Sequence, residues 1–89
     1  MITEGEARRI AERDLDRRIR PDAGLDIVIT GVEDFPGYWV VNYNSRAFVE
    51  TGSFLDALAG NAPIIIDKAT GESRFGSTAE PIEDQLERM

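Results

Sequence analysis

Residues 50–71 of the chain read ETGSFLDALAGNAPIIIDKATG. The segment joins a glycine-bounded loop, a Gly-Asn-Ala-Pro corner at 60–63, an apolar run and an Asp-Lys-Ala-Thr-Gly turn at 67–71. Turn-forming residues at this density indicate that the backbone path is tightly specified. We therefore predict a strand at 63–68, a tight turn at 69–72 and a hairpin partner at 73–76.

The N-terminal segment has the pattern of an amphipathic helix. Thr3 and Glu6 form a capping-box sequence, in which each side chain accepts a hydrogen bond from the backbone of the other residue. Apolar residues then recur at helical spacing. They are Ala7, Ile10, Ala11, Leu15 and Ile19. Because a residue before proline is disfavoured in the α region, Pro21 is expected to end a helix that spans 4–19.

Two strands follow the helix. Residues 25–32 alternate and are rich in β-branched side chains, with Leu25, Ile27 and Ile29 on one face. A turn at 34–37 leads into a second strand at 38–44.

The remaining predicted elements are short. We expect a turn or bulge at 45–46, a short third strand at 47–50 and a single helical turn within 54–59. Pro81 suits the first position of a short C-terminal helix, with Ile82 and Leu86 on one side.

This order of elements predicts an α+β fold in one domain, 1–89, with the N-terminal helix packed on a four- or five-stranded antiparallel sheet and a short C-terminal helix. Neither face of the strand at 38–44 is cleanly polar. A sheet with one solvated face would alternate apolar and polar residues. The second face is therefore expected to be covered by the C-terminal segment, by the loop around Phe54 or by a partner.

The amino-acid composition limits the classes of partner that the chain could bind. The chain has 17 acidic and 10 basic residues, a net charge of −7 and no cysteine or histidine. Six of the ten cations lie between Arg8 and Arg20, so the remainder of the chain is strongly acidic. This balance argues against nucleic acid or an anionic membrane as partner. It is compatible with a basic protein partner or with solubility alone. The polar N-terminus and the absence of cysteine favour a cytoplasmic location.

Catalytic chemistry is not indicated. The commonest general base and nucleophile types are missing, and Lys68, the one lysine, is expected to be exposed beside a turn. Glu50, Asp56 and Asp67 could offer oxygen ligands, but no calcium-loop spacing accompanies them. We therefore predict a non-enzymatic chain with no catalytic, cofactor-binding or metal-binding residues.

Binding of another protein is the class of function that remains. Aromatic residues and arginine are the usual anchors of interfaces. The candidate protein-binding residues are Tyr43, Arg46, Phe48, Glu50, Phe54 and Asp56.

Several residues near these candidates have structural interpretations. Trp39 is expected to pack under the first helix, whereas Tyr38 and Tyr43 are each as easily exposed as buried. Arg46 is either a plain loop cation or a partner of Glu50. Asn61 is expected to close its own corner, and Asp67 to brace the Thr70-Gly71 turn.

The chain resembles the family of small bacterial immunity proteins known as immunity protein 35, or the YrhB-type domain. The resemblance rests on Ile2 with Glu6-Ala7-Arg8, on Trp39, and on the run Gly60-Asn61-Ala62-Pro63, Ile64-Ile65-Ile66, Asp67 and Thr70-Gly71. It implies a non-catalytic binding protein that acts as an antidote to a toxin, which is a basic protein if the acidity is functional. A holdase or accessory interaction domain is the alternative, and a monomer or homodimer is compatible with either.

Overall fold

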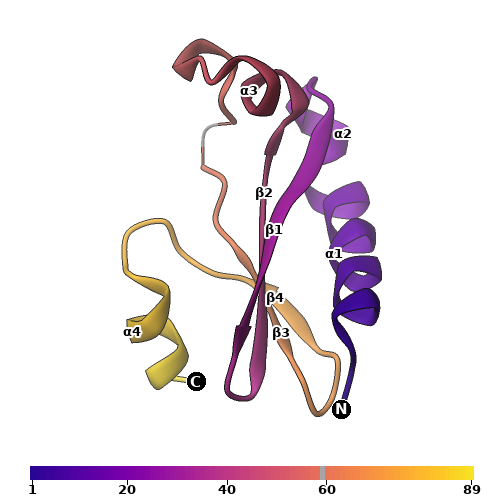
Figure 1. The fold of residues 1–89 in the computed structure, drawn as a ribbon, viewed down its shortest axis with the longest axis vertical. Coiled ribbons are helices and arrows are strands. Elements are labelled where there is room, and N and C mark those ends of the chain that lie inside the picture. Colours follow the sequence, from indigo (N-terminus) through magenta and orange to yellow (C-terminus); the bar gives the residue numbers. More distant parts are fainter. Residues whose placement is uncertain (59) are drawn as a thin grey trace.

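The computed structural model describes residues 1–58 and 60–89. It contains an antiparallel sheet in the order β1-β2-β3-β4 with helical segments on both sides (Figure 1). The strands are β1 (Ile27–Phe35), β2 (Tyr38–Ser45), β3 (Ile64–Asp67) and β4 (Ser73–Phe75). The helices are α1 (Glu4–Arg18), α2 (Arg20–Ala23), α3 (Arg46–Thr51), the single 3₁₀ turn η1 (Phe54–Asp56) and α4 (Ile82–Glu87). The predicted α+β class, with an N-terminal helix, a four-stranded sheet and a short C-terminal helix, is confirmed.

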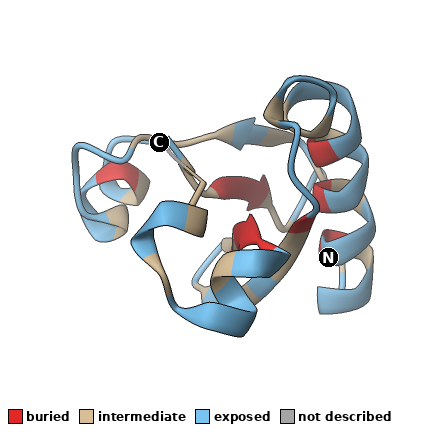
Figure 2. Ribbon diagram, turned by 90° about the horizontal axis from the view of Figure 1, so that it is seen from above, coloured by how far each residue is buried: buried red, intermediate tan, exposed pale blue. Residues whose placement is uncertain are grey.

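Helix α1 begins at the capping box and covers one face of the sheet. The Thr3 hydroxyl accepts from the Glu6 amide at 3.2 Å, and the Glu6 carboxylate accepts from the Thr3 amide at 3.0 Å. Figure 2 shows the buried residues of α1 on its inner side, and these are Ala7, Ala11 and Leu15. The helix ends close to the predicted position, but the chain re-enters a helical turn at α2. Pro21 lies in the first turn of α2, where a missing amide proton costs no hydrogen bond.

The core lies between α1 and the sheet. Alternation along the strands places Ile27, Val41, Tyr43 and the outer two residues of the Ile64–Ile66 triplet on this face. The Tyr43 ring meets Phe75 edge-to-face, with centroids 6.4 Å apart. Trp39 packs at the border of this cluster, as predicted, and its indole Nε1 donates to the Ile2 carbonyl at 3.1 Å.

The second face is covered at one end by the C-terminal segment. Helix α4 lies across the sheet from α1 (Figure 1). Its buried Gln85 donates to the carbonyls of Ser77 and Glu80, both at 2.9 Å, and accepts from the Ser77 amide at 2.8 Å. Gly76 lies so close that a Cβ there would be 2.7 Å from Gln85 Oε1 and 3.1 Å from Ile65 Cδ1. At this end, the second face of the sheet is therefore covered by the C-terminal segment, which is one of the three alternatives expected from the sequence.

The prediction of a short strand at 47–50 is wrong, because these residues belong to α3. Ser45 ends β2 and caps the helix, accepting from the Phe48 amide at 3.0 Å. Gly52 ends it with φ of 69°, a left-handed conformation that glycine adopts without strain. The turn or bulge expected at 45–46 is the beginning of this helix. The first strand also begins later than predicted, so Leu25 lies outside it, exposed. The helical turn predicted within 54–59 is η1, and Ala59 lies outside the described residues.

Candidate protein-binding surface

One buried residue positions α3 and η1 at the end of the sheet. The Ser45 hydroxyl accepts from the Phe48 amide in α3 and donates to the Asp56 carbonyl in η1. Ser45 is 1% exposed. The two elements are thereby tied to the last residue of β2, at the end of the sheet far from the β1–β2 turn (Figure 1).

Further hydrogen bonds fix the conformation of η1. The Thr51 hydroxyl lies 2.9 Å from the Asp56 carboxylate, and the Ser53 hydroxyl accepts from the Leu55 amide at 3.3 Å. Beyond η1, the amide of Leu58 donates to the buried Asn44 side chain at 2.8 Å. The loop is therefore specified by side-chain contacts on both sides of η1.

This fixed segment presents large apolar side chains to solvent. Phe54 is 90% and Leu55 96% exposed, and Val49 on α3 is 55% exposed. Side chains of this type are usually withdrawn from water, and adjacent exposed ones mark interaction sites. Together with Glu50 and Asp56 they form what we call the α3–η1 surface: Val49, Glu50, Phe54, Leu55 and Asp56.

The charge of the α3–η1 surface is negative. Among the described residues, neither Glu50 nor Asp56 has a cationic nitrogen within 4 Å, the limit for an ion pair. The nearby Arg46 is engaged by Asp26 at 2.6 Å, and that hydrogen bond raises the pKa of Arg46 above its ordinary value. The alternative that paired Arg46 with Glu50 is therefore wrong. Its partner lies on the connection before β1, which sequence spacing does not reveal.

The structure brings most of the sequence-predicted candidates together. Arg46, Phe48 and Glu50 lie on α3, and Phe54 and Asp56 lie on η1. Tyr43 does not join them, because it is 1% exposed in the core under α1. Its hydroxyl has no hydrogen-bond partner among the described residues, and burial raises the pKa of the phenol. Val49 and Leu55 were not among the candidates. Leu55 could have been found from its place beside Phe54 in a loop too short to bury both.

Three other sequence interpretations concern residues in or beside β3. Lys68 was expected to be exposed, but its side chain is 12% exposed, stacked over the Trp39 ring and paired with Asp34. Asn61 does not close its own corner, since its amide donates across to the Tyr43 carbonyl at 3.3 Å. Asp67 does brace its turn, accepting from the amides of Ala69 and Thr70 at 2.7 and 3.1 Å.

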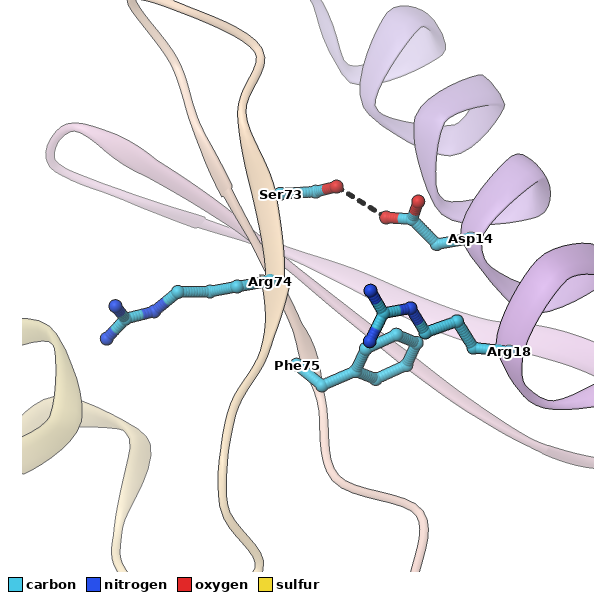
Figure 3. Close-up of a pocket in the computed structure, with 5 residues that line it drawn as sticks. All are labelled: Asp14, Arg18, Ser73, Arg74 and Phe75. Atoms are coloured by element: carbon cyan, nitrogen blue, oxygen red, sulfur yellow. Dashed lines mark hydrogen bonds between the residues drawn. The ribbon is translucent and has the colours of Figure 1, made fainter.

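A cavity of about 320 Å³ lies between α1 and β4, lined by Asp14, Arg18, Ser73, Arg74 and Phe75 (Figure 3). The Ser73 hydroxyl donates to the Asp14 carboxylate at 2.5 Å. Figure 3 shows Arg18 directed toward Phe75 and Arg74 directed away from it, so the two guanidinium groups do not converge. The polar groups of this cavity serve the contact between helix and strand.

Metal sites and membrane spans were sought in the part of the chain that the structure describes. It contains no group of three acidic, histidine or cysteine side chains placed to hold a metal ion. Within the same residues, no helix has the length and apolar character needed to cross a bilayer.

Comparison with known proteins gives a consistent result. The family model for immunity protein 35 matches residues 5–88. The uncharacterized protein YrhB of Escherichia coli strain K12 is 46% identical over 66 residues, which cover 74% of this chain and 70% of that protein. No solved structure gives a significant match. The matched span includes all but the first residue of α1, the whole sheet and both elements of the α3–η1 surface, and the chain belongs to the immunity protein 35 family.

Proposed function

We propose that this chain is a cytoplasmic immunity protein that binds a protein toxin and blocks it by occupying part of its surface. Family membership supports an immunity role in general, and such proteins are generally non-catalytic. The observation that carries the binding proposal is the exposure of Phe54 and Leu55 on a turn that buried Ser45 holds in place.

The chemistry of the α3–η1 surface suits a protein interface. Transferring a Phe or Leu side chain from water to an apolar contact is worth roughly 1.5–3 kcal/mol each. Because the turn is already ordered, little conformational entropy is lost when a partner covers it. The carboxylates of Glu50 and Asp56, which have no ion-pair partner among the described residues, favour a basic partner and accelerate its approach.

The first experiment is co-expression with the product of the adjacent gene, the natural place for a toxin–immunity pair. We expect that product to arrest growth, and we expect this chain to restore growth and to co-purify with it. The double variant Phe54→Ala/Leu55→Ala should weaken the complex by about 100-fold or more, the equivalent of two buried apolar side chains. Met89→Ala removes a partly exposed apolar side chain elsewhere and serves as the matched control.

Charge is tested separately from apolar contact. Glu50→Arg should slow association with a basic toxin and reduce its dependence on salt, because the steering charge is reversed. Glu72→Arg changes an exposed acid at the β3–β4 turn and should leave both unchanged. Full protection by the Phe54→Ala/Leu55→Ala variant would contradict the placement of the interface, and a neighbouring product without toxicity or complex formation would contradict the antidote role.

The same exposed side chains also favour a second candidate, a holdase that covers apolar segments of unfolded chains. The two functions differ in stoichiometry and selectivity. A holdase would suppress the aggregation of unrelated unfolded proteins through Phe54 and Leu55, whereas an immunity protein would form a complex of fixed stoichiometry with one folded toxin. An aggregation assay with the wild type and the Phe54→Ala/Leu55→Ala variant separates them.

A further inference from the structure

A groove of about 280 Å³ lies at the other end of the molecule from α3, between the β1–β2 turn and α4. Its lining residues are Phe35, Pro36, Tyr38, Glu83, Leu86 and Glu87. Small-molecule sites usually span about 300–1,000 Å³. This groove lies just below that range, so its size suits a single side chain.

The walls of the groove are apolar and aromatic. Phe35 and Tyr38 are paired across the hairpin, so their side chains project from the same face of the sheet. Leu86 faces them from α4, and Pro36 closes the turn. All three larger side chains are half-buried, which leaves part of each ring or chain open to an occupant.

The rim of the groove is acidic. Glu83 and Glu87 are four residues apart on α4 and therefore lie on one side of the helix. Among the described residues neither has an ion-pair partner. Two cations elsewhere in the chain are already paired, Lys68 with Asp34 and Arg88 with Glu80. Glu33, two residues before Phe35 on the same strand face, adds a further exposed carboxylate.

We infer that this groove binds an arginine side chain of the partner protein. A guanidinium group stacks on aromatic rings and donates to two carboxylates at its edge, and its aliphatic stem suits the contact with Leu86 and Pro36. A lysine ammonium is a compact, strongly hydrated charge and fits the flat aromatic walls less well. The neighbouring cavity, which shares Tyr38, is lined by Arg74 as well as by Asp67 and Glu72, so its charge is mixed.

The inference deepens the proposed function, since it specifies a side chain that the toxin presents, but its test does not need the toxin. We would titrate ¹⁵N-labelled protein with N-acetylarginine amide and follow the amide resonances. Saturable shifts confined to the β1–β2 turn and α4 are expected, in the millimolar range of a single side-chain contact. N-acetyl-leucine amide should produce at least tenfold weaker binding, because it lacks the charge.

Variants test the groups assigned to the groove. Glu83→Gln/Glu87→Gln should weaken arginine amide binding by about tenfold or more while keeping the dispersed spectrum of a folded protein. Asp22→Asn changes an exposed carboxylate on α2, away from both surfaces, and is the matched control that should bind as the wild type does. Shifts that are absent from the β1–β2 turn and α4, or that persist unchanged in the double Gln variant, would overturn the inference. Growth rescue by a chain that fails this titration would leave the antidote role standing, so the two failures are distinguishable.

Discussion

Ser45 and Asp56 are joined by a hydrogen bond from the buried hydroxyl of Ser45 to the backbone carbonyl of Asp56. The same hydroxyl accepts from the Phe48 amide, so a single side chain anchors both α3 and η1 to the end of β2. The Ser45 hydroxyl thus makes one hydrogen bond as donor and one as acceptor, both shielded from water. The position of the exposed Phe54 and Leu55 therefore depends on a residue that no partner can touch.

Ser45→Ala removes both hydrogen bonds and leaves the Phe48 amide and the Asp56 carbonyl without this partner. We expect the free energy of unfolding to fall by roughly 1–3 kcal/mol, the usual cost of losing a buried hydrogen-bonding group and a helix cap. Urea unfolding measures it. Ser53→Ala, which removes only the 3.3 Å contact to the Leu55 amide, should cost less. Equal effects of the two substitutions would show that Ser45 is not the anchor of α3 and η1.

The exposed apolar pair should be dispensable for folding. Phe54→Ala and Leu55→Ala remove side chains that are already in water, so each should change the free energy of unfolding by no more than about 0.5 kcal/mol. Ile66→Ala, in the core, should cost about 2–5 kcal/mol in the same urea titration. Substantial destabilisation by Phe54→Ala would mean that this ring packs against the chain in solution.

Much of the fold could be predicted because its determinants are local. The capping box at Thr3, the alternation along the first strand and the Asp67 turn each depend on residues within a few positions of one another. Helix α3 could not be predicted from its own β-branched and aromatic residues. Its formation depends on the Ser45 cap and on Gly52, so the helix is specified by the residues that flank it.

The candidate surface was predicted in part for the same reason. Glu50, Phe54 and Asp56 lie near one another in the chain and also in the structure. The sequence pattern does not predict contacts between residues that are far apart in the chain. Two such contacts are the pairing of Arg46 with Asp26 and the stacking of Lys68 on Trp39. Tyr43 was left open between the surface and the core, and it packs under α1 with Phe75.

Gly76 should be required for the docking of α4. A methyl group there would overlap Gln85 Oε1 and press on Ile65, so Gly76→Ala should destabilise the chain by roughly 1–3 kcal/mol. Gly31→Ala is the matched control, because a Cβ at that position meets nothing within 4 Å. Amide hydrogen exchange should accelerate in α4 more than in α1 of the Gly76→Ala variant. Unchanged exchange in α4 would show that Gln85 can move aside without loss of packing.

The buried phenol of Tyr43 should make stability fall at alkaline pH. Burial disfavours the phenolate and raises the pKa of Tyr43 in the folded state above its ordinary value of about 10. Below that pH the phenol is protonated in both states and contributes no pH dependence. Above it the unfolded chain releases its proton first, so the free energy of unfolding decreases until the folded-state pKa is reached.

Tyr43→Phe removes this titration and also the hydroxyl that lacks a partner among the described residues. At pH 7 the variant should be as stable as the wild type or more stable, by up to about 1–3 kcal/mol, because an unsatisfied buried hydroxyl is lost. Between about pH 9 and 11 its stability should decline less steeply, since every other titrating group is common to the two proteins. Urea titrations across this range measure the difference. Parallel pH profiles would show that the hydroxyl of Tyr43 reaches solvent in the folded protein.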